Sequence, residues 1–390
     1  MRTLLIQPGA RHGYALARFL HKADALQRLY TDFAIPDGSF EHRLLAAAAG
    51  LNPKARSLLR RVVPDLPGSM LQRLSLAALI AKRQAPNQRE RWNFRARDLR
   101  EADVVYSQYF AGGDQIEELV AHGARFVSDV FIMPSAHRVV NRESAKFPEW
   151  HETPYSPDAA AILDSVSKVM IERSDGLFCP SQSVIDDVAA YDPAARAKCR
   201  LVRYGSSLTF SQANEPIPKR VLFAGSIQLR KGPQYLALAA ARIARLDPSV
   251  RFVFAGGVTA AAASQLQAPN IEVLGHVSRD RMREEFLRAD ILAFPSLAEG
   301  SAGVVLEAMS AGLPIVATHE AGVDFRDGES GIIVPPTDVD ALADAILEIV
   351  GDRPRREAMA RSARAEFNAY DEERWGKTFV AALREFSRDG

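Results

Sequence analysis

Two glutamates flank a loop of small residues in the segment 290–318, DILAFPSLAEGSAGVVLEAMSAGLPIVAT. Glu299 lies before a predicted helix start, and Glu307 lies one turn inside that helix. A loop with little side-chain bulk lets backbone N–H groups approach a ligand, and a helix N-terminus carries partial positive charge. Because carboxylates accept hydrogen bonds from paired hydroxyls, this layout fits a diphosphate with hydroxyl-bearing groups on both sides, such as a nucleotide sugar. The loop residues expected to bind it are Gly300, Ser301, Ala302 and Gly303.

A second segment, RVLFAGSIQLRKGPQYLALAAARI at 220–243, carries two adjacent cations between a predicted strand and a predicted helix. Transfer of a sugar leaves negative charge on the departing diphosphate, and cations fixed at that position stabilise the transition state more than the ground state. Lys231 is therefore predicted to stabilise the leaving group, with Arg230 beside it. Gly225 and Ser226, where the strand ends, are predicted to border the same ligand.

The spacing E-x7-E followed by AMSAGLPIVAT resembles the signature of the family-4 retaining glycosyltransferases, also called glycosyl transferases group 1, which have the GT-B fold. The resemblance covers nearly all of residues 200–365. It implies that Glu299 contacts the donor sugar and that Glu307 holds the ribose hydroxyls, and Lys231 matches the family's lysine. The family's arginine directly after the strand-ending glycine is missing. Ser226 stands there, and Arg230 is its expected replacement.

In the first half of the chain the same resemblance indicates two further places. Gly9 and Gly13 follow the first predicted strand, in a turn that faces the ligand cleft in this fold. Related enzymes keep a histidine at the cleft after the strand that matches ARFVSDVF, where it helps to orient the sugar. His137 is the candidate for that catalytic role. A surface or capping role for His137 remains open, with Asp129 as the alternative.

No metal or cofactor is expected, and the nucleotide-diphosphate sugar is a donor substrate. Asp338 and Asp340 spell D-x-D, a metal-binding pattern in glycosyltransferases of another fold. Here the pair follows PPT and opens a predicted helix, where aspartate in the first turn offsets the helix dipole. The two cysteines, Cys179 and Cys199, are expected to be reduced thiols.

Short β-rich runs alternate with stretches at helical spacing through most of the 390 residues. The pattern predicts an α/β fold with two facing Rossmann-like domains, parallel sheets and a helical insertion in the first domain. Ligands of such sheets bind at the carboxyl ends of the strands, so the cleft between the domains is the expected site. The predicted parts are a first domain at 1–205 with an insertion at about 41–100, a linker at 206–220, a second domain at 221–366, and a helix at about 367–390 that packs back on the first domain.

Charge is distributed unevenly along the chain. The net charge is +1, yet residues 41–100 hold 13 Lys and Arg against 4 Asp and Glu, beside apolar stretches. This block predicts contact with an anionic membrane surface or an acidic acceptor, and a solvated helical face is the alternative. No stretch has the roughly 18 consecutive apolar residues of a membrane span, and the N-terminus lacks a signal-peptide core. We therefore expect a cytoplasmic protein, with peripheral contact at the inner face of the membrane left open and no nucleic-acid partner.

Together these patterns predict an enzyme, a glycosyltransferase that moves a sugar from a nucleotide-diphosphate donor. The expected acceptor is a glycan, a lipid-linked molecule or a polysaccharide intermediate. The resemblance implies retention of anomeric configuration by front-face attack, with the leaving phosphate accepting the proton of the acceptor. Two alternatives stay open, namely a nucleotide-sugar epimerase of the same fold and a non-catalytic partner subunit.

Overall fold

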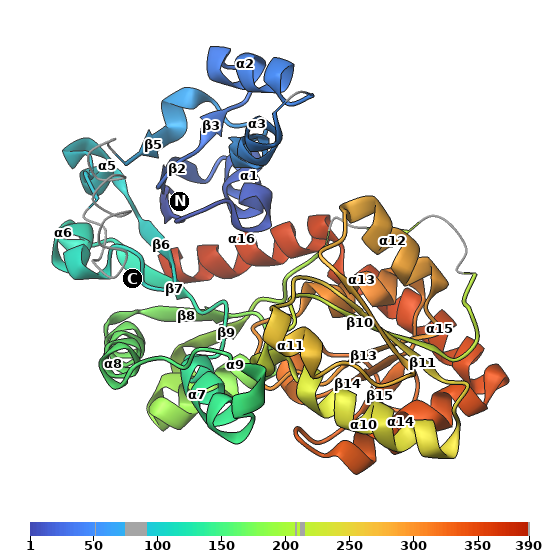
Figure 1. Ribbon diagram of the computed structural model, residues 1–390. Coiled ribbons are helices and arrows are strands. Elements are labelled where there is room, and N and C mark those ends of the chain that lie inside the picture. The colour runs from blue at the N-terminus through green and yellow to red at the C-terminus, as the bar shows by residue number, and fades with distance from the viewer. Residues whose placement is uncertain (51, 75–91, 207–208, 211–214, 389–390) are drawn as a thin grey trace.

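The computed structural model describes residues 1–50, 52–74, 92–206, 209–210 and 215–388. Two parallel sheets flanked by helices form two Rossmann-like domains (Figure 1), which confirms the predicted α/β fold class. The strand order is β5-β2-β1-β6-β7-β8-β9 in the first sheet and β12-β11-β10-β13-β14-β15 in the second. In each sheet the order reverses at a central strand, and the crevice beside such a point is where ligands of these folds bind.

The first sheet is buried along most of its length, as expected for parallel strands covered on both faces. Its strands are β1 (Thr3–Ile6), β2 (Leu26–Thr31), β5 (Leu71–Arg73), β6 (Val104–Gln108), β7 (Arg125–Asp129), β8 (Gly176–Cys179) and β9 (Cys199–Leu201). The helices beside it include α1 (Ala15–Lys22), α5 (Ala96–Glu101), α6 (Ile116–Val120), α7 (Ala136–Lys146), α8 (Pro157–Arg173) and α9 (Gln182–Tyr191).

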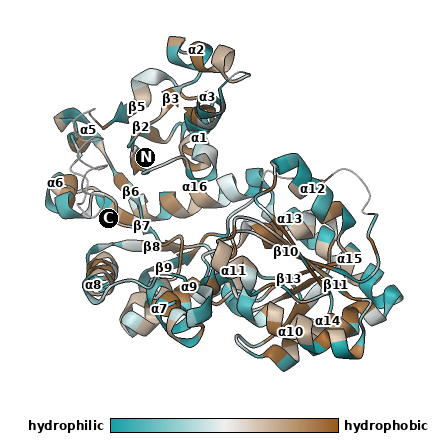
Figure 2. Ribbon diagram, in the orientation of Figure 1, coloured by the Kyte–Doolittle hydropathy of each residue, from teal (hydrophilic) through white to brown (hydrophobic). Residues whose placement is uncertain are grey.

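The second sheet lies at the centre of the largest apolar core cluster, and Figure 2 shows its strands as more hydrophobic than the outer faces of the surrounding helices. Its strands are β10 (Arg220–Ala224), β11 (Arg251–Ala255), β12 (Ile271–Gly275), β13 (Ile291–Phe294), β14 (Ile315–Ala317) and β15 (Gly331–Ile333). The helices around it are α10 (Pro233–Leu246), α11 (Ala260–Ser264), α12 (Arg279–Arg288), α13 (Gly303–Ala311), α14 (Val339–Gly351) and α15 (Arg353–Phe367).

The segment at 41–100 contains strands as well as the predicted helices. Helices α2 (Phe40–Ala48) and α3 (Pro53–Leu58) occupy its first part. Within it, β4 (Val62–Val63) pairs with β3 (Ile35–Pro36), which precedes the segment, and β5 joins the main sheet beside β2. Strands of two or three residues are too short to show a two-residue period, so the prediction of a purely helical insertion is incomplete. Residues 75–91 of this segment lie outside the described ranges.

The chain returns to the first domain through α16 (Glu372–Arg388), which packs against α1. The ring of Phe379 on α16 lies 5.0 Å from that of Tyr106 on β6. Within the segment predicted as a linker, 206–220, residues 207–208 and 211–214 lie outside the described ranges, and β10 begins at Arg220. Among the helices that the structure describes, none combines the length and apolar character needed to cross a bilayer.

Candidate functional site

Two loops of the second domain lie side by side because the strands that precede them are neighbours. Strands β10 and β13 pair in parallel, so both loops leave the same edge of the sheet. The loop after β10 contains the 3₁₀ turn Leu229–Lys231, and the loop after β13 covers residues 295–302 and leads into α13. The amide of Leu297 donates a hydrogen bond to the carbonyl oxygen of Arg230 at 2.8 Å. The topology thus joins the two segments that the sequence predicts to bind a diphosphate.

Glu299 lies between two cations at this junction. Its Oε1 is 3.0 Å from Nη1 of Arg230 and 3.5 Å from Nζ of Lys231. The three side chains are 13%, 16% and 18% exposed, in the order Glu299, Arg230, Lys231. Arg230 also donates to the carbonyl oxygen of Ala298. Two largely buried cations share one carboxylate, so the cluster keeps an excess positive charge that an anionic ligand could neutralise.

Gly225 makes room for the ammonium group of Lys231. Its φ of +124° is in a region that residues with a Cβ rarely adopt, and an added Cβ would lie 3.3 Å from Lys231 Nζ. Ser226 follows and is half-buried. The positive group beside this strand end is therefore Lys231 rather than a residue at position 226.

The N-terminus of α13 points backbone donors at the same region. Among the described residues, the amides of Ser301, Gly303 and Val304 donate to no other group. Unpaired amides of this kind, at the positive end of a helix dipole, are a common phosphate site. The amide of Ala302 instead donates to the carbonyl oxygen of Ala321 at 2.9 Å. This bond anchors the loop to the segment after β14, so the Ala302 amide is already engaged in this structure and the binding role of this residue stays a prediction.

Glu307 projects from the second turn of α13 and is half-buried. Burial raises the pKa of its carboxyl from 4.5 to about 7, and the nearby Arg279 opposes that shift. Within the described ranges no side chain or amide donates a hydrogen bond to this carboxylate. A desolvated acceptor without a protein donor is suited to receive hydroxyl donors from a ligand.

The two domains touch at the loop after β13. A Cβ at Gly300 would lie only 1.8 Å from the carbonyl oxygen of Phe131, which follows β7 in the first domain. The guanidinium of Arg11 lies 3.9 Å from the centre of the Phe131 ring and donates to its carbonyl oxygen at 3.4 Å. Gly300 therefore serves packing between the domains, in addition to the ligand approach predicted for it. Phe131 also links the first loop of the chain to the loop after β13.

The predicted turn after β1 is a constrained segment. The amide of Gly9 donates to Oδ1 of Asp32 at 2.9 Å. Gly13 has a positive φ of 58°, and its neighbours His12 and Tyr14 have values of 49° and 60°. Consecutive left-handed residues with side chains are costly, and such strain concentrates at functional sites. Through Arg11, this turn lies at the same inter-domain junction as Gly300.

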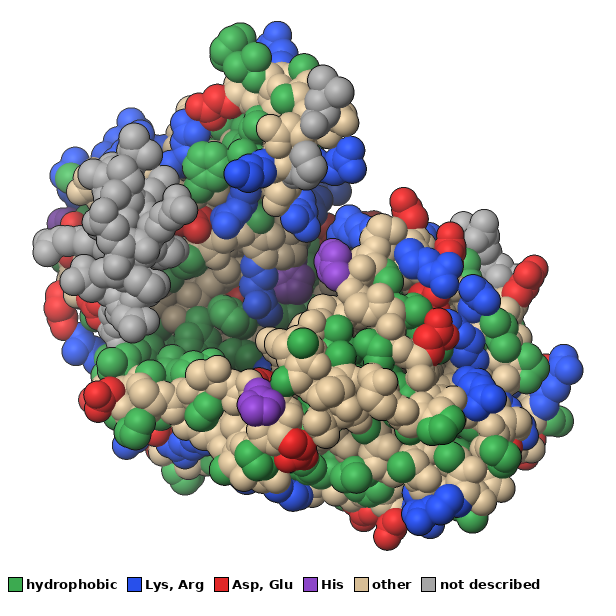
Figure 3. Space-filling model, viewed as in Figure 1, with side chains coloured by type: hydrophobic (Ala, Val, Ile, Leu, Met, Phe, Trp, Pro, Cys, Tyr) green, Lys and Arg blue, Asp and Glu red, His purple; other side chains and the backbone are tan. Residues whose placement is uncertain are grey.

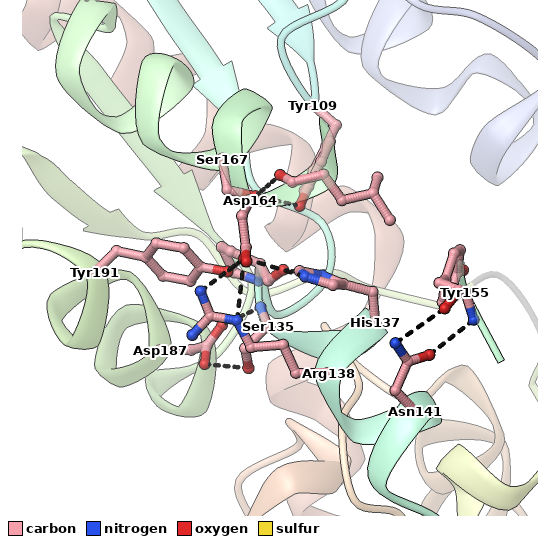
Figure 4. Close-up of polar contacts among 12 residues, drawn as sticks. Tyr109, Ser135, His137, Arg138, Asn141, Tyr155, Asp164, Ser167, Asp187 and Tyr191 are labelled. Carbon is pink, nitrogen blue, oxygen red and sulfur yellow. Dashed lines mark hydrogen bonds and ion pairs between the residues drawn. The ribbon is translucent and has the colours of Figure 1, made fainter. Parts of the chain in front are cut away.

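His137, near the start of α7, is held by the first domain (Figure 4). Its Nδ1 lies 3.1 Å from the carbonyl oxygen of Pro134, and its Nε2 lies 3.1 Å from Oδ1 of Asp164. Asp164 also accepts hydrogen bonds from Arg138 at 2.6 Å and from Tyr191 at 2.8 Å. Burial alone would raise the pKa of Asp164, but these donors and the His137 charge lower it. Nδ1 of His137 thus contacts a backbone carbonyl, while the buried Nε2 lies near Asp164 without a hydrogen-bond partner among the described residues.

A small cavity nevertheless connects His137 with the cationic turn. It has a volume of about 180 Å³ and is lined in part by His137, Glu152 and Arg230. Oε2 of Glu152 accepts a hydrogen bond from the amide of Leu229 at 2.6 Å, so the first domain holds the turn that carries Arg230. Glu152 was not predicted. It lies in an irregular stretch after Trp150, and no motif or periodicity marks it.

Asp129, the alternative to His137, lies at the end of β7 and is 1% exposed. It accepts a hydrogen bond from the hydroxyl of Tyr204 at 2.6 Å. Burial raises its pKa to about 6, against the opposing effects of Tyr204 and Arg11. Asp129 is therefore a buried group under the inter-domain junction, while His137 lines a cavity shared with the second domain.

The D-x-D pair has ordinary structural contacts. Asp338 caps α14 by accepting from the amide of Ala341 at 2.9 Å, as predicted for an aspartate that opens a helix. Asp340 pairs with Arg242 at 2.6 Å. No group of three or more His, Cys, Asp or Glu residues that could hold a metal occurs in the described part of the chain.

The space-filling view shows a hollow between the two domains, with Lys, Arg and His side chains on its walls (Figure 3).

Residues 218–352, which include the turn Leu229–Lys231 and both glutamates, match the family model described as Glycosyl transferases group 1.

Curated relatives cover part of the chain. A D-inositol 3-phosphate glycosyltransferase of Paenarthrobacter aurescens (strain TC1) is 30% identical over 212 residues, or 51% of this chain and 49% of the relative. A glycogen synthase of Mycobacterium tuberculosis (strain CDC 1551 / Oshkosh) is 26% identical over 258 residues, or 63% of this chain and 61% of the relative. The chain therefore spans about half to three fifths of the length of these relatives.

Solved structures match over the whole chain. A sucrose-phosphate synthase from Thermosynechococcus elongatus gives a TM-score of 0.65 at 17% identity and covers 100% of both chains. Anabaena HepE, in complex with UDP and glucose, gives 0.60 at 15% identity and covers 99% of this chain and 100% of that chain. At these identities the likeness shows the fold, and it agrees with the two-domain arrangement in Figure 1.

Proposed function

We propose that this chain, whose residues 218–352 match the glycosyl transferases group 1, transfers a sugar from a nucleotide-diphosphate donor to an acceptor hydroxyl. The observation that carries the proposal is the group of Arg230, Lys231 and Glu299 beside the N-terminus of α13. Two cations and unpaired amides suit a diphosphate, and the carboxylate beside them suits a polyol.

In this proposal each part of the site binds one part of the donor. The phosphates contact Lys231, Arg230 and the amides at the start of α13. Glu299 accepts hydrogen bonds from sugar hydroxyls while its charge remains balanced by the two cations. Glu307, whose carboxyl has no donor among the described residues, accepts the ribose hydroxyls. Gly225 and Ser226 border the phosphates, and Arg230 supplies the cation that Ser226 does not.

The chemistry proposed is front-face substitution with retention. The bond between the anomeric carbon and the phosphate oxygen breaks, and the bond to the acceptor oxygen forms on the same face. The proton of the acceptor hydroxyl moves to the departing phosphate oxygen, so no protein base is required. Lys231 and Arg230 stabilise the negative charge that develops on the diphosphate.

His137 is proposed to position the wall of the sugar pocket. Its ring nitrogens face Pro134 and Asp164, while the cavity that it lines also reaches Arg230. In this role the ring sets the shape of the pocket, and a direct contact with the sugar would require one of these contacts to break. Gly9 and Gly13 are proposed to form the acceptor side of the same cleft, opposite the donor loop.

The acceptor is proposed to be a glycan, a lipid-linked molecule or a polysaccharide intermediate. The relatives include a D-inositol 3-phosphate glycosyltransferase and a glycogen synthase, so their names alone do not select one acceptor class. The first domain of this chain carries the basic 41–100 block, which favours an acidic or membrane-bound acceptor.

The experiment is a thermal-shift screen with UDP-, GDP-, ADP- and dTDP-sugars, since a ligand that binds the folded state raises the melting temperature by mass action. We expect one nucleotide class to raise it at millimolar ligand. The stabilising donor, labelled in its sugar, is then incubated with the protein and with candidate acceptors. The product should carry the label in the donor's anomeric configuration, as read by NMR.

The alternatives give different results in the same assay. An epimerase would convert the donor without any acceptor, after slow donor hydrolysis has been subtracted. A non-catalytic subunit would give no turnover, and failure of all four donor classes to stabilise the protein would favour it. Inversion of the anomeric configuration would contradict the front-face step.

A further inference from the structure

Helix α2 presents an apolar face that has no partner in the described chain. The helix contains no buried residue, and the side chains of Phe40 and Leu44 are 74% and 55% exposed. These residues are four apart and therefore lie on one face of the helix. A nine-residue helix in water is stabilised mainly by burying its apolar face, and this one half-buries Leu45 but leaves Phe40 and Leu44 largely uncovered in the protein. The face is therefore available to another surface.

Basic side chains surround this face. Arg43 lies on α2 itself, and Lys54 and Arg56 are exposed on α3, which packs against α2. Arg60, in the turn after α3, has no acidic partner among the described residues. Its guanidinium donates a hydrogen bond to the hydroxyl of Ser57. Of the described acids nearby, Glu41 pairs with Arg73 at 2.9 Å, while Asp37 lies 3.0 Å from His42 Nδ1, which accepts a hydrogen bond from the amide of Gly38. The surface therefore combines exposed apolar groups with excess positive charge.

The position of α2 leaves the donor site open. The helix lies at the end of the first domain that is farthest from the second domain (Figure 1). In the space-filling view, hydrophobic side chains lie beside Lys and Arg side chains at this end (Figure 3). A surface that contacted α2 would not cover the hollow between the domains.

We propose that α2 docks on an anionic lipid bilayer, with Phe40 and Leu44 inserted at the headgroup boundary and Arg43, Lys54 and Arg56 against the lipid phosphates. Exposed apolar side chains on one face, flanked by Lys and Arg, are the properties of helices that lie in the membrane interface. A second copy of this chain is a poorer occupant, because a two-fold contact through α2 would bring the same basic residues together. This docking surface is one face of the basic block at 41–100. Docking there does not depend on the proposed catalytic activity.

The test is co-sedimentation of the full chain with vesicles of phosphatidylcholine alone and with about one third phosphatidylglycerol, at low salt. We expect binding to the anionic vesicles and little binding to the neutral ones. The variant Phe40→Ser/Leu44→Ser should lower the partition coefficient by more than about tenfold, because both inserted side chains are lost. Arg43→Gln/Lys54→Gln should weaken binding and reduce its dependence on salt.

The matched control is Leu238→Ser/Leu246→Ser on α10, which removes two apolar side chains that are 48% and 62% exposed in the second domain. This control should bind the anionic vesicles like the unmodified protein. Circular dichroism and melting temperature check that each variant folds. Equal binding by Phe40→Ser/Leu44→Ser and the unmodified chain would overturn the proposal. So would a dimer, seen by light scattering without lipid, that this variant converts to monomer.

Discussion

At the scale of single residues, Lys231 makes the most direct prediction. Its ammonium lies 3.5 Å from Glu299 in the space that Gly225 leaves open. If it stabilises the leaving diphosphate, Lys231→Ala should lower kcat by about 100- to 1,000-fold with little change in melting temperature. Steady-state kinetics with saturating donor measure this change. Lys168→Ala, at an exposed site on α8, is the control and should keep full turnover. Unchanged kcat in Lys231→Ala would remove this residue from the mechanism.

Replacing Glu307 by glutamine should have opposite effects on the stability of the fold and on donor binding. The pKa of its carboxyl is raised from 4.5 to about 7, chiefly by burial. Between these values the folded state binds more protons than the unfolded chain, so this group makes the fold less stable as pH rises through the window. Glu307→Gln should therefore have a higher melting temperature than the unmodified protein at pH 8, and the difference should vanish below about pH 4.5.

The same substitution should weaken donor binding. Ionised Glu307 is the better acceptor for ribose hydroxyls, so donor affinity in the unmodified protein should rise between pH 6 and pH 8. Glu307→Gln should bind less tightly at pH 8 and should lose this pH dependence. Isothermal calorimetry measures both. Equal affinity of the two proteins at pH 8 would refute the ribose role.

At the scale of elements, the contact between the loops after β7 and β13 is the critical feature. A methyl group at position 300 would meet the carbonyl oxygen of Phe131 at 1.8 Å. Gly300→Ala must therefore push the two loops apart, at a cost of about 1–3 kcal/mol in the free energy of unfolding. We expect a lower melting temperature together with reduced turnover, because the donor loop and the Arg11–Phe131 pair shift together. Gly351→Ala, where nothing lies within 4 Å, is the control for stability and should be neutral or stabilising.

Strands and helices with a clear apolar pattern were predictable from the sequence. The contacts between these elements were not. Strands such as β10 and β13 are continuous apolar runs bounded by glycine or proline, and both were predicted. The mixed run Leu26–Thr31 forms β2, which was missed because polar residues interrupt it. Strand β5 was missed because it has only three residues. The order of the strands follows from the fold class rather than from any one of these runs.

In the candidate site too, residues in local motifs were predictable and contacts between distant segments were not. Arg230, Lys231 and Glu299 were singled out by local motifs, and the structure brings them together because β10 and β13 are neighbours. The role of Glu152 comes from an irregular segment 77 positions before its partner Leu229, a separation that no local pattern reveals. The engaged amide of Ala302 likewise depends on a loop from another strand. Local chemistry was predictable, and long-range hydrogen bonds were not.

At the scale of the whole molecule, the chain crosses between the domains more than once. It leaves the first domain after β9, builds the second domain, and returns through α16 (Figure 1). Trp375, Phe379 and Leu383 of this helix belong to a core cluster of the first domain. The stability of the first domain therefore depends on α16.

Phe379→Ala tests this dependence. The ring is 0% exposed and lies 5.0 Å from Tyr106 and 6.1 Å from Phe178, so its removal leaves a cavity between α16 and the first sheet. Such truncations cost about 3–5 kcal/mol. Phe379 belongs to a different core cluster from the one around the second sheet, although that cluster also includes Ala136, Val139 and Trp150 of the first domain. We therefore expect calorimetry to show a first-domain transition at lower temperature while nucleotide binding to the second domain persists below its own transition. Ile162→Ala, at a 57% exposed site on α8, should leave both transitions in place. A single transition that moves as one, with donor binding lost at the same temperature, would show instead that the two domains unfold together and that α16 stabilises the donor site as well.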